Sequence, residues 1–274
     1  MISIKSDREI RLMREAGKLN YLTHEEIKKH LKVGVKTKEL DQIAYDFITH
    51  HQARPSFLHY EGYPASICVS VNDEVVHGIP GERRIKDGDV VSIDIGVEIH
   101  GYHSDAARTY VVGKASKDVE DLVKNTEFAL YAGLQKIHEG AKIGDIGAAI
   151  EKFAHEHGLS VVEELVGHGV GTNIHEDPDV PNYGKEGTGV TLKAGMVLAV
   201  EPMLNLGERY VYLHDDDWTI STDDGYPSAH FEHTVVVTKD GYEILTGEIS
   251  KWKKIIKMML IKKQKRKKLK WKEK

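Results

Sequence analysis

The amino-acid sequence predicts an α+β fold in which two pseudo-symmetric αβ halves surround a mostly antiparallel sheet. Three observations support this class. Segments with helical apolar spacing alternate with short β-rich segments. A helix and the strand that follows it recur later in the chain as an internal repeat. Two of the β-rich segments flank Gly101 in the pattern of a hairpin.

Helical signals mark four segments. Ser6 followed by Glu9 is a capping-box pattern that begins the first of them. Apolar residues after Thr37 recur on one helical face, so Thr37 is expected to cap the second. The four expected helices run from Ser6 to about Lys32, from Thr37 onward, from Ser116 to about Glu139, and from Asp145 to just before Gly158.

Strand signals lie between and after these helices. They fall at 65–71, 89–99, 107–112, 196–204 and 233–238, where apolar and β-favouring residues are concentrated. A tight turn centred on Ile99 and His100 would set Asp94 directly opposite Asp105. Directly opposed residues share one face of a sheet, so the two carboxylates could share ions.

The internal repeat pairs carboxylates with carboxylates. Residues 33–51 resemble 139–157 at an offset of 106, and 87–95 resemble 194–202 at an offset of 107. The second match places Asp94 on Glu201. With about 20 extra residues in the second copy, a further match places Asp105 on Glu232.

The four carboxylates lie in or beside apolar strand sequence, which predicts burial. Several buried carboxylates that converge cannot all stay ionised unless positive charge is present, and Arg108 is the main cation nearby. A metal cluster supplies that charge. His168, between Gly167 and Gly169, is a fifth candidate ligand. Oxygen ligands with one imidazole suit Mn, Fe or Co, and also Zn.

The set Asp94, Asp105, His168, Glu201 and Glu232 has spacings of 11, 63, 33 and 31 residues. With the segments VNDEVVHGIP, GHGVG, NIHEDP, VLAVEPM and FEHTVVVT, it resembles the ligand set of the type I methionine aminopeptidases, over about residues 3–247. The resemblance implies the pita-bread fold, a monomer, and removal of the initiator methionine from nascent polypeptides where the second residue is small.

The resemblance also implies a role for each ligand. Asp94 would chelate one of two divalent ions, and His168 and Glu201 would bind the other. Asp105 and Glu232 would bridge both. Glu201 would in addition take a proton from the attacking water and pass it to the leaving amine.

Further residues are implicated by the same resemblance. His175 would stabilise the oxyanion of the tetrahedral intermediate, and His77 would contact the substrate backbone or the leaving nitrogen. Asn72 and Ser228 would help to hold a monovalent cation.

The methionine pocket implied by the resemblance departs from the family at one position. The pocket would be lined by Tyr63, Cys68 and Trp218, with Phe57 and Tyr60 nearby. The family usually has an aromatic residue before the second histidine, where this chain has Ile174. This departure bears on the shape of the pocket and not on the chemistry.

Composition indicates the compartment. Cys68 is the single cysteine, which excludes an intrachain disulfide and zinc sites built on two or more cysteines. The charged N-terminus lacks the apolar centre of a signal peptide, and no run of about 18 apolar residues exists to span a membrane. We therefore expect a cytoplasmic protein without a DNA partner.

The last residues differ from the rest in charge. Residues 251–274 carry a net charge of +12, so the other 250 residues carry −17 of the total of −5. We expect a catalytic domain at 1–249 and a basic tail at 250–274 that is disordered or an amphipathic helix. A solvated tail, an artefact of the reading frame, an anchor on ribosomal RNA and a membrane-surface segment remain alternatives.

Two other functions are compatible with the pattern. Proline-specific peptidases of the same fold typically carry a large N-terminal domain, whereas here the catalytic pattern begins almost at Met1. A binding module that has lost catalysis typically loses metal ligands, and all five are present. The 31 residues between Glu201 and Glu232 leave no room for the helical insertion of the type II methionine aminopeptidases.

Overall fold

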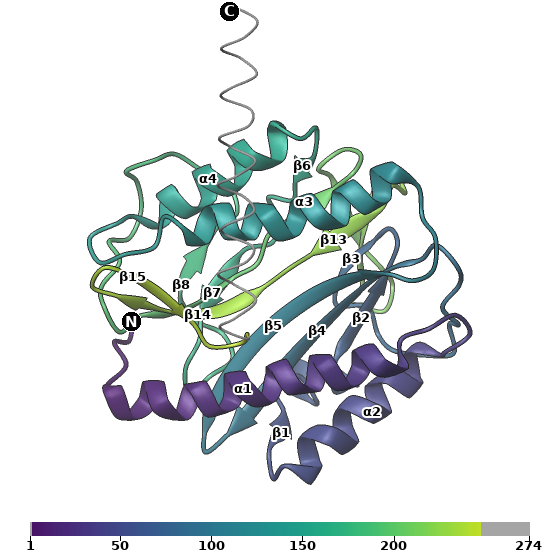
Figure 1. Ribbon diagram of the computed structural model, residues 1–274, viewed down its shortest axis with the longest axis horizontal. Coiled ribbons are helices and arrows are strands. Elements are labelled where there is room, and N and C mark those ends of the chain that lie inside the picture. Colours follow the sequence, from purple (N-terminus) through teal and green to yellow (C-terminus); the bar gives the residue numbers. More distant parts are fainter. Residues whose placement is uncertain (1, 248–274) are drawn as a thin grey trace, which may run out of the picture.

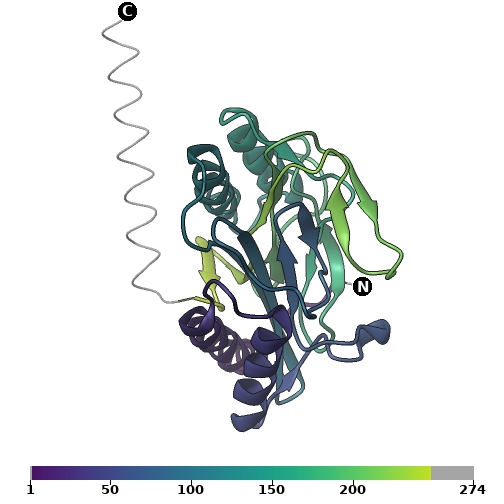
Figure 2. The same ribbon diagram turned by 90° about the vertical axis from the view of Figure 1, so that its right-hand side faces the viewer.

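A computed structural model describes residues 2–247, and Figure 1 shows their arrangement. The basic tail expected at 250–274 lies outside the described residues. Helices α1 and α2 cover one part of the sheets and α3 and α4 cover the other, all on one side of the molecule (Figures 1 and 2). The four helices of the described residues are α1 Asp7–His30, α2 Thr37–His50, α3 Lys117–Leu134 and α4 Ile143–His155.

Every strand pair among the described residues is antiparallel, as the sequence predicts. The first half contains β1 Arg54–Pro55, β2 Cys68–Val71, β4 Val90–Ile99 and β5 Tyr102–Val111 in one sheet. The second half contains β7 Gly167–Gly169, β8 Glu176–Val180, β9 Val197–Val200, β14 His233–Thr238 and β15 Gly241–Ile244.

Two small sheets complete the described fold. One has the order β13-β10-β6, with β6 Ser160–Val161, β10 Met203–Asn205 and β13 Ser228–His230. The other has the order β11-β12-β3, with β3 Glu74–Val76, β11 Val211–Leu213 and β12 Ile220–Thr222. The continuous strand expected at 196–204 is therefore divided into β9 and β10, which belong to different sheets.

Two of the predicted helix caps are confirmed, and one helix is shorter than predicted. Ser6 caps α1 as predicted, because its backbone N–H donates to the Glu9 carboxylate at 2.7 Å and its hydroxyl accepts from the Glu9 N–H. Ser116 caps α3 as predicted, but α3 ends at Leu134 and not near Glu139.

The predictions that Thr37 caps α2 and that Asp145 caps α4 are wrong, because each residue lies inside its helix. Lys36 caps α2, and the Thr37 hydroxyl instead accepts from the Gly81 N–H at 2.8 Å. Asp145 lies three residues inside α4, where its carboxylate accepts from the N–H of the capping residue Lys142 at 2.8 Å. In α2 the corresponding carboxylate is that of Glu39, which accepts from the Lys36 N–H at 3.0 Å, so an acidic side chain in the first turn satisfies the helix end in both cases.

The internal repeat is confirmed in detail. Gly34 and Gly140, 106 residues apart, both have positive φ, 91° and 88°. The N–H of Gly34 donates to Ile85 C=O at 2.8 Å, and that of Gly140 donates to Leu192 C=O at 2.9 Å. The same backbone geometry therefore leads into α2 and into α4.

The β4–β5 hairpin exists, but its predicted register is wrong. His100 and Gly101 both have positive φ, 56° and 79°, as a two-residue primed turn requires. This turn places Asp94 opposite Ala107 and Asp105 opposite Gly96. The difference from the prediction is two residues along the partner strand, so the two carboxylates are diagonal neighbours on the same face.

The two halves are joined by threonine side chains rather than by a continuous backbone ladder. The Thr234 hydroxyl accepts from the Asp105 N–H at 2.8 Å and donates to the Asp105 C=O at 2.7 Å. In the reverse direction, the Thr109 hydroxyl donates to the His230 C=O at 2.7 Å and accepts from the His230 N–H at 2.9 Å. We call this pair of contacts the threonine seam.

Each half has its own apolar core beneath its helices. The core under α1 and α2 includes fully buried Leu40, Ile48, Ile67, Ile93 and Ile95. The core under α3 and α4 includes fully buried Leu130, Leu134, Ile146, Ile150 and Leu198. Within residues 2–247, none of the helices has the length and apolar character needed to cross a bilayer.

The seam generates a stability prediction. Thr234→Val leaves the N–H and C=O of buried Asp105 without partners, at a cost of about 1–3 kcal/mol for each group. We expect the urea midpoint to fall clearly, measured with chelator present so that metal binding does not contribute. Thr238→Val, at the half-buried end of the same strand, should change stability by no more than about 0.5 kcal/mol. Equal midpoints for both variants would contradict the role of the seam.

Candidate metal centre

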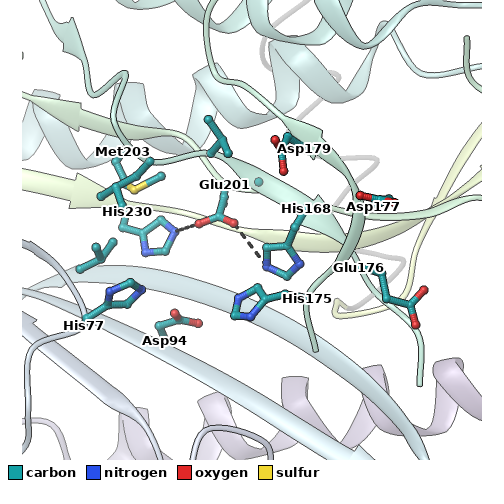
Figure 3. Close-up of a pocket in the computed structure, with 14 residues that line it drawn as sticks. His77, Asp94, His168, His175, Glu176, Asp177, Asp179, Glu201, Met203 and His230 are labelled. Atoms are coloured by element: carbon teal, nitrogen blue, oxygen red, sulfur yellow. Dashed lines mark ion pairs between the residues drawn. The ribbon is translucent and has the colours of Figure 1, made fainter. Parts of the chain in front are cut away.

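The five predicted ligands converge on the sheet face away from the helices. Asp94 is on β4 and Asp105 on β5, His168 is on β7, Glu201 directly follows β9, and Glu232 directly precedes β14. Side chains that are up to 138 residues apart in the chain thus meet at the junction of the two halves. Figure 3 shows Asp94 below and Glu201 and His168 above one cavity.

Three overlapping groups of potential ligand atoms occur among the described residues, and two of these groups consist of the predicted ligands alone. One oxygen each from Asp94, Asp105 and Glu232 lie within 4.8 Å of one another, and so do ligand atoms of His168, Glu201 and Glu232. His168 Nε2 lies 3.6 Å from Glu201 Oε1 and 3.8 Å from Asp105 Oδ2. Glu232 is common to these two groups, and a third group joins Asp105 and His168 with His175, which the sequence did not predict as a ligand.

Several of these oxygens are buried without a partner. Asp105 is 3% exposed and Glu232 1% exposed. Oδ1 of Asp94, Oδ1 of Asp105 and Oε1 of Glu232 are buried and accept no hydrogen bond in the structure. Unpaired buried anionic oxygens are costly, so the donor set fits cations.

Basic side chains do not supply the missing charge. The residues that line the cavity include no lysine or arginine. Arg108, the cation that the sequence offered nearby, lies on the opposite face of β5 and pairs with Glu25 on α1 at 3.1 Å. Carboxylate oxygens with one imidazole are the ligands of hard to intermediate divalent metals.

Burial shifts the pKa of each carboxyl upward when no metal is bound. Desolvation raises the pKa of Asp94 to about 6 and that of Glu201 to about 8. Desolvation, followed by repulsion from neighbouring carboxylates, raises the pKa of Asp105 and Glu232 well above the ordinary values. Protons and metal ions therefore compete for the same oxygens.

The surroundings of His168 keep its imidazole neutral, which is the form that can bind a metal ion. Desolvation and the nearby His175 lower its pKa to about 3. Its Nδ1 donates to the Gly169 C=O at 2.8 Å, which leaves Nε2 free to face the carboxylates. A hydrogen bond at one ring nitrogen commonly fixes the other for metal binding.

The predicted catalytic histidines border the same cavity. His175 lies with its ring centroid 4.2 Å from that of His168, and its Nδ1 lies 2.9 Å from the Tyr60 hydroxyl. His77 follows β3 with a positive φ of 59°, and desolvation lowers its pKa to about 4. Figure 3 shows both rings directed into the cavity between Asp94 and His168.

The predicted methionine pocket is a single apolar cluster. Tyr63, Cys68, Phe57 and Ile174 are buried in it, and Tyr60 and Trp218 pack against it. The Trp218 ring meets the Tyr63 ring edge-on, with centroids 5.1 Å apart. Cys68 lies directly opposite Asp94 in the β2–β4 pair, which places the pocket beside the metal ligands. Ile174, 1% exposed, fills the place at which the family usually has an aromatic residue.

The cavity has a volume of about 400 Å³ and contains residues that the sequence analysis missed. His230 is 1% exposed, and its Nε2 lies 3.4 Å from Glu201 Oε2. Leu165 and Met203 line the cavity beyond it. A signal for His230 was present, because it lies two residues before Glu232 in a β-rich segment.

The predicted monovalent-cation residues are neighbours. The Ser228 N–H donates to the Asn72 C=O at 2.9 Å. The Asn72 side chain is engaged with Asp89 at 3.0 Å and with the Val90 N–H at 2.9 Å. A cation at these two residues stays a prediction.

Comparison with known proteins identifies the same family that the motifs resemble. The sequence profile of metallopeptidase family M24 matches residues 11–239. Methionine aminopeptidase 1 of Bacillus subtilis is 54% identical over 246 residues, which cover 90% of this chain and 99% of that protein. The methionine aminopeptidase of Escherichia coli is 44% identical and covers 89% of this chain and 94% of its own length.

Solved structures give the same result. The crystal structure of methionine aminopeptidase from Rickettsia prowazekii matches with a TM-score of 0.89 and 44% identity, over 90% of this chain and all of that one. Prolidase from Pyrococcus furiosus matches with a TM-score of 0.73 and 22% identity, over 89% of this chain and 65% of that one. The second similarity concerns the fold alone. These likenesses confirm the predicted pita-bread fold.

Competition between protons and metal ions can be measured by thermal unfolding. Because the folded-state pKa values of Asp94 and Glu201 are raised above those of the unfolded chain, the metal-free folded state binds more protons between about pH 4 and 8. The free energy of unfolding of the chelator-treated protein should therefore fall as pH rises through this window. Added Mn²⁺ should raise the melting temperature more at pH 8 than at pH 5.

Glu232→Gln is the control for this experiment, because it removes one of the titrating carboxyls. The variant should show a shallower loss of stability with pH than the parent, both without metal. A metal-free parent whose stability is flat or rises between pH 5 and 8, or a variant with the parent's slope, would contradict the raised pKa values.

Proposed function

The chain belongs to metallopeptidase family M24 and is a methionine aminopeptidase of type I, and we propose that it removes the initiator methionine from nascent proteins by dinuclear-metal hydrolysis. The observation that carries this proposal is the juxtaposition of overlapping ligand groups with an apolar cluster, through the pairing of Cys68 with Asp94. A substrate with its first side chain in the pocket would have its first peptide bond beside the ligands.

The ligand groups support a division of labour between two ions. Asp94 would hold one ion, His168 and Glu201 would hold the other, and Asp105 and Glu232 would bridge them. When bound, two divalent ions supply Lewis-acid polarisation of the scissile carbonyl and a water of lowered pKa. Co, Mn, Fe and Zn all suit this donor set.

The protein's own side chains would move the proton and bind the developing charge. Glu201 would take the proton of the attacking water and return it to the leaving amine. Its position supports this role, because one carboxylate oxygen is directed toward His168 and the other toward His230. His175, hydrogen-bonded to Tyr60, would stabilise the oxyanion, and His77 would contact the substrate backbone or the leaving nitrogen.

The apolar pocket supports a preference for methionine as the first residue. Tyr63, Cys68 and Trp218 offer a sulfur atom and two aromatic rings, which favour a flexible thioether. On the other side of the ligands, Val76, Met203 and His230 line the cavity, and all three are almost fully buried. Buried side chains cannot easily move aside, which supports a preference for a small second residue in the substrate.

The proposal also covers the localisation, the oligomeric state and the partners of the enzyme. We propose a cytoplasmic monomer that acts on nascent chains, with a catalytic domain at 1–249 and a basic tail at 250–274 that contacts ribosomal RNA. We also propose a monovalent cation near Asn72 and Ser228, and no DNA partner. The charge of residues 251–274, a net +12, supports the RNA contact.

A substrate panel tests the proposal. With added Mn²⁺, Co²⁺ or Fe²⁺, Met-Ala-Ser should be cleaved with a kcat/KM about 100-fold above that of Met-Lys-Ser. Chelator should abolish both reactions. Faster cleavage of Xaa-Pro peptides would instead indicate a proline-specific peptidase, and no turnover with any of the ions would indicate a binding module.

His175→Ala tests the assignment of the oxyanion. Loss of one oxyanion donor should lower kcat by about 10²–10³ while the metal content stays near that of the parent. His50→Ala, an exposed histidine on α2, is the matched control and should leave kcat unchanged. A His175→Ala variant with parental kcat would remove His175 from the mechanism.

A further inference from the structure

Exposed apolar side chains gather on one hairpin beside the cavity. Several of the large hydrophobic residues that are exposed in the described chain lie in the segment containing β11 and β12. They are Tyr210, Tyr212, Leu213 and Tyr226. Scattered exposed hydrophobics are ordinary, but a group of them marks an interaction surface. The hairpin, drawn in green at the right of Figure 2, stands on the side of the molecule away from α1.

Strand β11 is an edge strand. It pairs with β12 on one side and is terminal in the order β11-β12-β3. The His214 N–H donates to Thr219 C=O at 2.9 Å, and the Asp223 N–H donates to Tyr210 C=O at 3.0 Å. Because hydrogen-bonded pairs alternate in an antiparallel ladder, the backbone groups of Val211 and Leu213 are directed to the open edge. We call Val211–Leu213 with this outward backbone the β11 edge.

The β11 edge packs against residues that line the cavity. Val211 packs in one apolar cluster with Val76, Leu165 and Met203, and these three residues line the cavity. Leu213 is on the same face of the strand as Val211 and is 57% exposed. The hairpin loop that directly follows Leu213 carries Trp218 to the predicted methionine pocket.

We propose that the β11 edge is an exosite for the substrate polypeptide, which binds there as an added strand from about its third residue onward. The inference rests on the proposed function. A chain whose first side chain is in the pocket and whose first peptide bond is at the metal ligands must leave the cavity. One apolar cluster contacts both Leu165, which lines the cavity, and Val211 at the open edge, so the edge is close to the cavity.

Strand addition fits the substrate class chemically. An edge strand binds a chain mainly through main-chain hydrogen bonds, which do not depend on the side chains of the partner. An enzyme that acts on many proteins needs such contacts beyond the first two residues. The exposed Leu213 side chain adds apolar contact of low specificity.

The test compares substrates of different length that begin with the same residues. The parent enzyme should have a lower KM for an octapeptide Met-Ala-Ser-X5 than for Met-Ala-Ser. Leu213→Ser should raise the octapeptide KM about fivefold, which corresponds to partial loss of one apolar contact, and leave the tripeptide KM unchanged. Val33→Ser is the matched control, since Val33 is 54% exposed and lies between α1 and α2.

Backbone pairing is tested on the parent enzyme with N-methylated octapeptides. Methylation removes a donor, so octapeptides methylated at successive amides after the third residue should alternate between weakened and unaffected KM. Equal KM values for the tripeptide and octapeptide, a Leu213→Ser variant that impairs both substrates alike, or no alternation would overturn the exosite. A parent that fails to cleave the tripeptide would refute the proposed function instead.

Discussion

The whole site depends on the burial of carboxyl groups that repel one another. Asp105 and Glu232 come from different halves of the molecule and are brought together by the threonine seam. Their desolvation raises the pKa of both groups, and only a proton or a cation can relieve the repulsion. The fold therefore stores an unfavourable charge arrangement that metal binding can resolve, and this couples the assembly of the two halves to the chemistry of the centre.

The threonine seam and the β2–β4 pair position different parts of the site. The seam fixes the two central carboxylates through main-chain contacts, which do not depend on side-chain rotamers. The pairing of Cys68 with Asp94 then places the apolar pocket one strand away from the ligands. The predicted pocket and one predicted metal ligand thus share the β2–β4 pair, and their separation is set by the strand spacing, about 4.8 Å.

Much of this arrangement could be predicted from the sequence. The repeat predicted two related halves, and Gly34 and Gly140 confirm it with equal backbone geometry. The five candidate ligands were predicted from burial and spacing together with the family resemblance, and the structure brings them together. The capping residues were less predictable, because Thr37 and Asp145 are equally plausible as caps and as residues of the first turn. For Thr37, only the tertiary contact of its hydroxyl with Gly81 decides between the two roles.

Other features required three-dimensional information. The hairpin register depends on the positive φ of His100, which is uncommon for residues other than glycine and which the sequence does not reveal. The seam was missed because Thr234 is an ordinary strand residue until β5 is placed beside β14. His230 was missed because its role arises from proximity to Glu201, 29 residues earlier in the chain.

The threonine seam has a consequence for the interpretation of damaged variants. A substitution that loosens the junction between the halves separates Asp105 from Glu232 without altering any ligand. Such a protein would purify with little metal and resemble an enzyme with a defective active site, although its fault is mechanical. Titration with excess cation distinguishes the two conditions, since a loosened junction can be drawn closed by mass action whereas a missing ligand cannot be replaced.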